Sequence, residues 1–291
     1  MHSLALVTTT TARELDDDLA PLDAALRAAG IQTRIVDWDD ERTDWSKFTA
    51  VLLRSPWDYS FRLEEFLAWC KRVSFVTTLL NPLDVVRWNT DKHYLRDLAR
   101  LGVATVESHF IEPGDEPDTF PQFDEFVVKP AVGAGSRDAQ RFLLTDRAGA
   151  VDHVKKLIRA HRAALVQPYL SRVDEEGETA LIFFDGEFSH AIRKGALLHR
   201  GQESTRALFA PEHITPRTPS DAEMALARRV IQSLPFDTLA YARVDLLPSS
   251  SGPKLLELEL TEPSLFFPTS EGSAERFAKV LAARLEALAA D

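Results

Sequence analysis

Two neighbouring segments near the C-terminus constrain the fold of this chain more than any other feature. They are residues 241–247 and 254–260. Both alternate apolar with charged side chains, and a Pro-, Ser- and Gly-rich stretch separates them, which predicts two strands joined as a hairpin. Because side chains alternate between the faces of a strand, Arg243 and Asp245 share one face, as do Glu257 and Glu259. A symmetric hairpin places Asp245 opposite Glu257, so three carboxylates and one guanidinium crowd together.

The crowding of carboxylates in this hairpin needs compensation, because like charges opposite one another destabilise a sheet. A divalent cation bound by oxygen ligands offsets that cost, and Mg²⁺ commonly binds through a few carboxylates together with substrate phosphates. Asp245, Glu257 and Glu259 are therefore candidate metal ligands. The alternative is a solvated polar face on an amphipathic hairpin, which would favour mixed charges over three clustered carboxylates.

A second charged feature is a predicted strand over 126–129 that ends in Lys129 and runs into a short loop. The loop carries Gly133, Gly135, Ser136 and Arg137. Glycine lets backbone N–H groups approach phosphate oxygens closely, and the two cations would neutralise them. The P-loop pattern is absent, and Asp138 stands at the third glycine position of the dinucleotide-binding pattern. An ordinary turn beside a lysine that extends into solvent is the alternative.

A third segment, residues 165–170, is an apolar strand that ends in a Pro-stiffened corner containing Gln167, Tyr169 and Leu170. Such a corner could hold a flat heterocycle, and Glu178 could accept hydrogen bonds from a ribose. Further positive charge comes from Lys92, Arg193 and Lys194. A strand end followed by a charged loop explains this segment equally well when it is taken alone.

The first third of the chain alternates predicted strands with predicted helices. The strands are expected over 4–7, 32–36 and 50–53, and this order favours a parallel βαβ sheet. Ligands of such sheets bind beyond the carboxyl ends of the strands. The polar and aromatic residues that directly follow the third strand are candidates for substrate binding: Arg54, Ser55, Trp57, Asp58 and Tyr59. A Pro-bent loop whose aromatic side chains cap the core is the alternative.

Composition narrows the functional classes. The 291 residues include 34 Lys and Arg against 45 Asp and Glu, for a net charge of −11. Such a surface repels nucleic acid and anionic lipid, and no apolar run approaches the roughly 18 residues of a membrane helix. The single cysteine, Cys70, fits a reducing compartment. We therefore expect a cytoplasmic protein with no nucleic-acid or membrane partner. Neither HExxH nor GxSxG occurs, so no hydrolase pattern is present.

Taken together and in order, these segments resemble the ATP-grasp superfamily. The resemblance rests on Lys92, residues 126–130, the loop 133–137, residues 166–170, Glu178, Lys194, and residues 243–245 and 256–263. It implies a mixed α/β and α+β fold class, with an ATP-grasp fold preceded by an N-terminal βαβ (pre-ATP-grasp) domain. We expect the N-terminal domain over 1–88, a central lobe with the phosphate loop over 89–170, and a C-terminal lobe with the metal site over 171–291.

The resemblance also implies an activity and a set of residue roles. ATP would activate a carboxylate as an acyl phosphate, which a nitrogen then attacks, forming ADP and phosphate. The implied ATP-binding residues are Lys92, Lys129, Gly133, Gly135, Ser136, Gln167, Tyr169, Leu170, Glu178 and Lys194. Two Mg²⁺ ions are implied at Asp245, Glu257 and Glu259, and the implied catalytic residues are Arg243, Lys194 and Arg193. The substrate would contact Arg54, Ser55, Trp57, Asp58, Tyr59, Arg137 and Arg193 beneath a lid over 195–219.

The layout of residues 53–59 and 183–190 is similar to that of cyclo-ligases that close the ring of the antibiotic D-cycloserine from O-ureido-D-serine. This likeness implies a small amino-acid-like substrate and attack by a nitrogen of the same molecule. Two alternatives stay open: intermolecular ligation of an amino acid or peptide to a second amine, and ATP sensing without turnover. Three metal carboxylates favour turnover over sensing. Relatives are often dimers or tetramers, so the sequence is compatible with a homo-oligomer.

Overall fold

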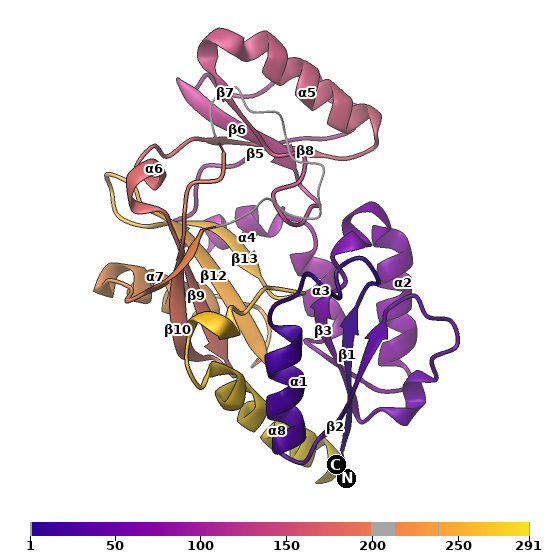
Figure 1. Ribbon diagram of the computed structural model, residues 1–291. Helices are drawn as coiled ribbons and strands as arrows, with labels where there is room; N and C mark the ends of the chain where they lie inside the picture. Colours follow the sequence, from indigo (N-terminus) through magenta and orange to yellow (C-terminus); the bar gives the residue numbers. More distant parts are fainter. Residues whose placement is uncertain (1, 199–212, 238, 291) are drawn as a thin grey trace.

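Three β-sheets and the helices that cover them make up the described part of the protein (Figure 1). The computed structural model describes residues 2–198, 213–237 and 239–290. The sheets follow one another along the chain. In Figure 1 the second sheet lies at the top, and the first and third lie side by side beneath it.

The N-terminal sheet is parallel throughout, as the sequence predicts. Its strand order is β2 (Gln32–Asp37), β1 (Ser3–Thr8), β3 (Ala50–Ser55) and β4 (Thr78–Leu80). Helix α1 (Leu19–Ala28) packs on one face, and α2 (Leu63–Ser74) and α3 (Leu83–Asn89) pack on the other. Because both faces are covered, the middle strands are continuous apolar runs and do not alternate.

The central sheet is antiparallel. Its strand order is β5 (His109–Ile111), β8 (Ala164–Pro168), β6 (Glu125–Pro130) and β7 (Gln140–Leu143). Phe126 and Val128 of β6 pack against α5 (Arg147–Arg159). The alternation of the strand therefore turns Val127 and Lys129 to the opposite face, where both line a cavity.

The C-terminal sheet is also antiparallel and contains the hairpin predicted from residues 241–247 and 254–260. Its strand order is β11 (Ile214–Arg217), β10 (Glu187–Lys194), β9 (Glu178–Phe184), β12 (Tyr241–Leu247) and β13 (Lys254–Glu259). Helices α4 (Tyr94–Arg100) and α7 (Asp221–Gln232) pack on one face, and α8 (Ser273–Ala290) packs on the other. The short helix α6 (Val173–Glu176) precedes β9. None of the helices in the described ranges has the length and apolarity needed to cross a lipid bilayer.

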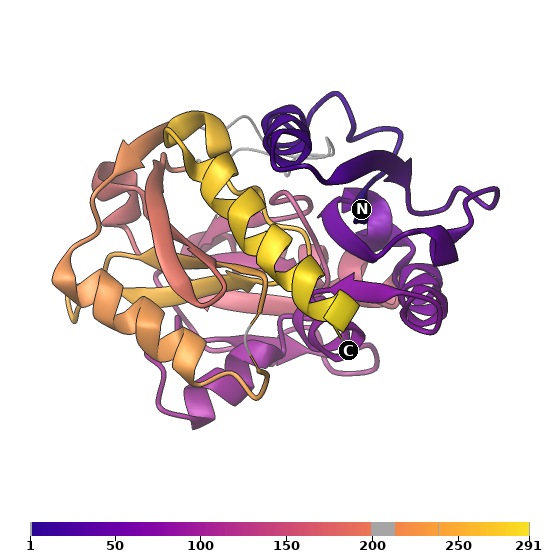
Figure 2. The ribbon, with the colours of Figure 1, turned by 90° about the horizontal axis from the view of Figure 1, so that it is seen from below.

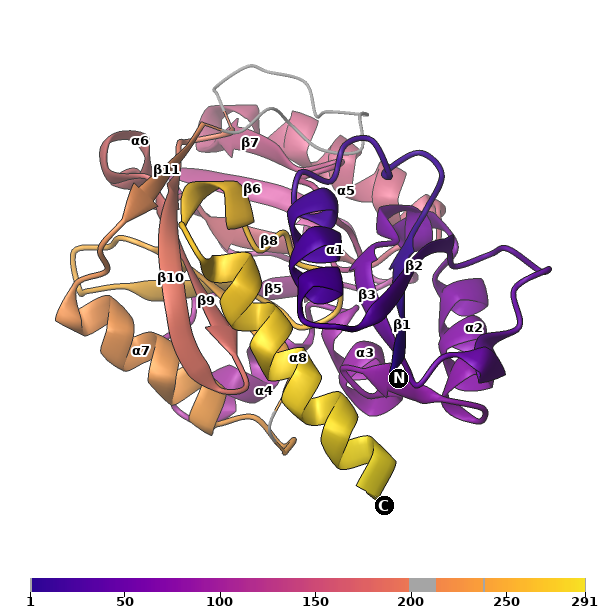
Figure 3. The same cartoon turned by 60° about the horizontal axis from the view of Figure 1, so that its bottom comes forward.

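Packing crosses the boundaries between the three expected segments, although each segment contains one sheet. Helix α8 lies beside α1, where Phe277 and Leu281 share a core with Leu22 and Leu26 (Figures 1 and 3). Seen from below, α8 runs between the C-terminal sheet and the N-terminal lobe (Figure 2). Helix α4, in the second expected segment, packs on the third sheet. The lobes are thus joined by shared apolar cores as well as by the chain.

A short turn over residues 90–93 separates two helices before the central sheet. Helix α3 ends at Asn89 and α4 begins at Tyr94. The Asn89 side chain donates a hydrogen bond to the carbonyl of Leu258 and accepts one from the N–H of Leu260, both at 2.7 Å. Because its amide fixes β13, Asn89 does not cap a helix. Lys92 consequently lies in the turn between α3 and α4.

A strap of irregular backbone, residues 261–267, follows β13 and is held by side chains from other elements. Its five successive carbonyls at 261–265 accept hydrogen bonds, in order, from Tyr241, Trp57, Arg54, Arg243 and His190. The N–H groups of residues 265–267 donate to the carboxylate of Asp18 at 2.5–3.0 Å. Buried backbone groups need such partners, and here both the N-terminal lobe and the C-terminal sheet supply them.

We predict that Asp18→Ala lowers the free energy of unfolding by about 3 kcal/mol. The change removes the acceptor of three backbone N–H groups, and it leaves the buried Arg54 without the carboxylate that lies 3.8 Å away. Urea unfolding measures the loss. The exposed neighbour Asp17 is the control, and Asp17→Ala should shift stability by less than about 0.5 kcal/mol. Equal effects of the two changes would contradict the structural role of Asp18.

Candidate functional site

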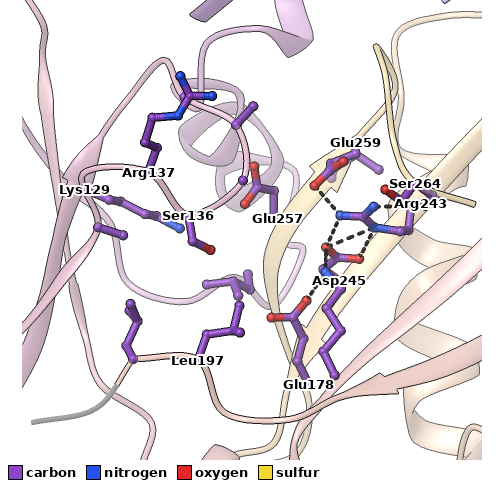
Figure 4. Close-up of a pocket in the computed structure, with 18 of the residues that line it drawn as sticks. Lys129, Ser136, Arg137, Glu178, Leu197, Arg243, Asp245, Glu257, Glu259 and Ser264 are labelled. Carbon is purple, nitrogen blue, oxygen red and sulfur yellow. Dashed lines mark hydrogen bonds and ion pairs between the residues drawn. The ribbon is translucent and has the colours of Figure 1, made fainter. Parts of the chain in front are cut away.

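A cavity of about 410 Å³ is lined by residues from all three lobes (Figure 4). Strands β12 and β13 provide its charged wall, and β6 with the loop that follows it faces that wall. The register pairs Asp245 with Glu257 and Arg243 with Glu259. The hairpin therefore aligns its charges as the alternation of the sequence predicts.

Two cations neutralise the carboxylates at the centre of this wall. Arg243 donates from Nε to Oδ1 of Asp245 at 2.9 Å, and from Nη2 to Glu259. Lys194 Nζ donates to Asp245 Oδ2 at 2.8 Å and to Glu178 Oε1 at 2.6 Å. Much of this network is drawn with dashed lines in Figure 4. It joins β9, β10, β12 and β13 at one end of the sheet.

Lys92 connects the wall to the loop after β6. Its Nζ lies 2.9 Å from Glu257 Oε1 and donates to the carbonyl of Gly133 at 2.9 Å. Lys129 enters the same space from β6, and Figure 4 shows its amine directed toward Ser136 and Glu257. Two lysines thus face the carboxylates across the cavity.

Burial and charge act in opposite directions on the paired carboxylates. Burial acts to raise the pKa of Asp245, but Arg243 and Lys194 outweigh it and hold that pKa well below its usual range. Burial likewise opposes ionisation of Glu257, and the positive charge of Lys92 lowers its pKa below the usual value. Both groups are therefore ionised at neutral pH, which suits metal or cation binding.

For other ionisable groups in the cavity, burial has the largest effect on the pKa. It raises the pKa of Glu259 to about 7 and that of Glu262 to about 8, and it lowers the pKa of Lys129. A neighbouring carboxylate adds to the shift of Glu262, because the charge of Glu259 disfavours a second ionised group. The cavity thus holds several ionisable groups whose charge would change when an anion or a cation binds beside them.

Asp245, Glu257 and Glu259 fit Mg²⁺ in donor type, and all three line one cavity from register-paired strands. Across the ranges that the structure describes, no three His, Cys, Asp or Glu side chains converge as a group ready to hold an ion. The three carboxylates are instead engaged with Lys92, Lys194 and Arg243. Metal binding would therefore require these ion pairs to open or to share their oxygens.

One part of the cavity wall is apolar. It includes Val127, Leu170, Leu247 and Leu256, and the last three belong to one apolar cluster. Gln167 also lines the cavity and donates from Nε2 to Ser108 Oγ at 3.0 Å. The guanidinium carbon of Arg141 lies 3.4 Å from the ring centroid of Tyr169, which also borders the cavity. A flat apolar ligand would find two walls of suitable character here.

The loop after β6 takes the conformation that close backbone approach requires. Gly135 and Ser136 both have positive φ, 65° and 57°. Glycine adopts that region without cost, whereas serine does so at some expense in backbone energy. Gly133, Gly135, Ser136 and Arg137 all line the cavity. The loop and the charged wall therefore enclose one space.

Several residues that the sequence assigns to the site do not line the cavity. Arg193 donates to the carbonyls of Glu175 and Glu176, because it lies on the face of β10 opposite to Lys194. Ser55 bonds Thr8 inside the N-terminal sheet. These two polar groups support the framework around the cavity.

Residues 54–59 divide between structural and cavity positions. Arg54 is fully buried and donates to the strap, while Asp58 accepts from Trp38 and Arg62 outside the cavity. Trp57 and Tyr59 do line the cavity, as the sequence predicts. The alternative interpretation of this segment, a Pro-bent loop whose aromatic side chains cap the core, is therefore correct for some of these residues.

The expected lid over 195–219 falls partly outside the described residues, since 199–212 are not among them. Residues 195–198 line the cavity. Residues 214–217, expected as loop, form strand β11 at the edge of the C-terminal sheet. β11 pairs with the end of β10 that carries Lys194.

The structure adds three polar groups that sequence reasoning did not single out. Glu262 bonds the hydroxyl of Tyr59 at the cavity wall, and Ser264 lies beside it on the strap. Asp16 is 7% exposed, lines the cavity, and has one carboxylate oxygen, Oδ2, without a hydrogen-bond partner among the described residues. The three successive aspartates at 16–18 could have indicated a binding site, but they are equally typical of the start of a helix.

The chain is similar to known proteins along its whole length. A family model described as the N-terminal domain of D-cycloserine synthetase DcsG matches residues 4–81. The cycloserine biosynthesis protein DcsG of Streptomyces lavendulae is 41% identical over 300 residues, covering 98% of this chain and 100% of that protein. A crystal structure of D-cycloserine synthetase DcsG superposes with a TM-score of 0.92 at 40% identity, covering 97% of this chain and 99% of that chain.

A more distant structure bears on the fold alone. The ATP-grasp ligase PsnB, complexed with a phosphomimetic variant of its minimal precursor, Mg and ADP, superposes with a TM-score of 0.64 at 18% identity, covering 98% of this chain and 99% of that one. The ATP-grasp fold that the sequence predicts is therefore confirmed. The extent of the 41% match, over nearly all of both proteins, goes further: this chain is a member of the DcsG family of D-cycloserine synthetases.

Proposed function

We propose that this chain closes the D-cycloserine ring from O-ureido-D-serine, using ATP to activate the substrate carboxylate. As a member of its family, the chain is an ATP-dependent carbon–nitrogen ligase. The observation that carries the proposal is that a charged sheet wall, two lysines and a glycine-containing loop line the same cavity. The N-terminal lobe completes that cavity with a carboxylate suited to an amino acid.

The nucleotide would lie between the central lobe and the C-terminal sheet. The adenine fits the apolar part of the cavity wall beside Gln167, Tyr169 and Leu170, and Glu178 would accept from the ribose. The phosphates would then reach the loop 133–136. Lys92, Lys129 and Lys194 are close enough to that loop or to the charged wall to neutralise phosphate oxygens.

Two Mg²⁺ ions would be held by Asp245, Glu257 and Glu259 together with phosphate oxygens. Their contribution when bound is to neutralise charge on the phosphoryl group during transfer. Arg243 keeps Asp245 and Glu259 in position and lies on the same wall, so it is the natural partner for negative charge on the acyl phosphate.

The chemistry then needs no covalent enzyme nucleophile. The substrate carboxylate attacks the γ-phosphorus and releases ADP, which leaves an acyl phosphate. A nitrogen of the same molecule attacks the acyl carbon, loses a proton, and expels phosphate. Formation of D-cycloserine also requires hydrolysis of the bond between the ring nitrogen and the carbamoyl carbon: water attacks that carbon, the ring nitrogen takes up a proton, and the carbamate released breaks down to carbon dioxide and ammonia. The chain contributes orientation and charge stabilisation.

Asp16 supports an amino-acid substrate. Asp16 lines the cavity from the N-terminal lobe, and one of its carboxylate oxygens is buried without a hydrogen-bond partner among the described residues. A buried, unpaired carboxylate oxygen is costly unless a ligand donor satisfies it. The α-ammonium group of O-ureido-D-serine would supply that donor and the opposite charge.

The first test is ADP release with Mg²⁺ and ATP, with and without O-ureido-D-serine as the sole second substrate. We expect ADP release that depends on this compound and a product with the mass of D-cycloserine. An added amine should be unnecessary, because both reacting groups belong to one molecule. A requirement for a second amine would instead favour intermolecular ligation, and nucleotide binding without turnover would favour a sensor.

We predict that Glu257→Gln lowers the turnover number about 100-fold or more and leaves the fold intact. The amide keeps the shape and a hydrogen-bond acceptor for Lys92, but it loses the charge that would hold a metal ion. ADP release and the thermal midpoint together measure the two effects. Glu275→Gln, an exposed change on α8, serves as the control. Wild-type ADP release by the Glu257 variant would remove this residue from the metal site.

We predict that Asp16→Asn raises the KM for O-ureido-D-serine about tenfold to a hundredfold, because a charge-assisted hydrogen bond to the ammonium group is lost. The affinity for a non-hydrolysable ATP analogue should not change. Steady-state kinetics and calorimetry provide the two values. Asp152→Asn, an exposed change on α5 away from the cavity lining, is the control. An unchanged KM in the Asp16 variant would place the ammonium group elsewhere.

A further inference from the structure

We propose that Phe61 is a positioning residue, which docks the loop 133–137 onto the N-terminal lobe through a cation–π contact with Arg137. This inference rests on the proposed function in one respect: the proposed function assigns the loop to the phosphates of the nucleotide. Phe61 lies outside the cavity lining and would touch neither substrate. Its effect would reach the nucleotide through the position of the loop.

The contact is between an exposed ring and a buried cation. Phe61 ends the short 3₁₀ helix Trp57–Phe61 of the N-terminal lobe, and its side chain is 58% exposed. The guanidinium carbon of Arg137 lies 4.3 Å from its ring centroid, and that of Arg162 lies 6.0 Å away. Arg137 is only 7% exposed, so the cation is largely removed from water. A partly desolvated cation strengthens such a contact.

Residues within the loop and directly beside it make further contacts, so the Phe61–Arg137 contact is part of a docking arrangement. Val132 and Ala134 pack against the apolar core of the N-terminal lobe. On the other side, Asp138 accepts from Arg162 at 2.7 Å, and its carbonyl lies 2.8 Å from the ring nitrogen Nε2 of His153 on α5. The loop is thus fixed between two lobes.

The orientation of Arg137 agrees with a docking role. Figure 4 shows its guanidinium directed away from Lys129 and Glu257. Burial lowers the pKa of Arg137, and the Asp138 carboxylate opposes that effect. The positive φ of Ser136 turns the backbone between the cavity-facing glycines and this side chain. The contact between Arg137 and Phe61 therefore fixes the position of the loop backbone relative to the cavity.

Phe61→Leu separates docking from folding, because it keeps an apolar side chain but removes the aromatic face. We expect the KM for ATP and the dissociation constant of a non-hydrolysable ATP analogue to rise about twofold to tenfold. Amide hydrogen exchange over residues 132–138 should quicken in the nucleotide-free protein. The thermal midpoint should stay unchanged, since the residue is exposed.

Two further variants make the test specific. Phe61→Tyr keeps the aromatic face and should retain wild-type nucleotide affinity and exchange. Phe75→Leu alters a ring that is 78% exposed in the same lobe and should have no effect. Unchanged exchange and affinity in Phe61→Leu, or an equal loss in Phe61→Tyr, would overturn the proposal.

The readouts also separate this inference from the proposed function. If the wild-type protein binds the nucleotide but forms no cyclised product, the proposed substrate is wrong, and the Phe61 comparison still decides the docking role. If it binds no nucleotide, the exchange of residues 132–138 decides whether Phe61 holds the loop. Unchanged exchange in Phe61→Leu then overturns the inference.

Discussion

The strap 261–267 is the constraint on which the cavity depends, because its backbone is buried and has no sheet partner. Side-chain donors of two lobes satisfy it: Arg54 and Trp57 from the N-terminal lobe, and Arg243 and His190 from the C-terminal sheet. A buried loop without such partners would be costly. The same hydrogen bonds hold the lobes against each other and fix the wall that carries Glu262 and Ser264. Arg243 serves both the strap and the carboxylates of the site, so the fold and the charge network share a residue.

The charge network has a second consequence for function. Carboxylates concentrated on one sheet face would repel each other, and buried cations offset that repulsion. Lys92 and Lys194 are bound to carboxylates in this structure, yet both face the space proposed for phosphates. The phosphates of a bound nucleotide would pair with the lysines, and the Mg²⁺ that accompanies it would pair with the carboxylates. The site can therefore exchange internal ion pairs for ligand contacts without leaving a buried charge unpaired.

The sequence predicts the parts of the site that depend on local periodicity. Alternation along 241–247 and 254–260 is sufficient to align Asp245 with Glu257, because register and face follow from a short hairpin. Alternation does not predict the position of a side chain whose partner is distant in sequence. Arg193 looks equivalent to Lys194, but one strand step turns it away, toward α6. Arg54 resembles a substrate ligand at a strand end, but it bonds a carbonyl 209 residues away. Asp16 becomes informative only once the structure shows that the residue lines the cavity and that one of its carboxylate oxygens has no hydrogen-bond partner among the described residues.

An intramolecular reaction makes a particular demand on such a cavity. When both reacting groups belong to one molecule, the enzyme needs no site for a second amine, and its task is to hold one folded conformer with the carboxylate toward the phosphates. Orientation of this kind can supply much of the rate enhancement, provided that the walls do not move. Rigid backbone is well suited to that purpose. A strap with five consecutive carbonyls held by side chains, opposite a loop fixed between two lobes, gives the cavity two walls of this kind.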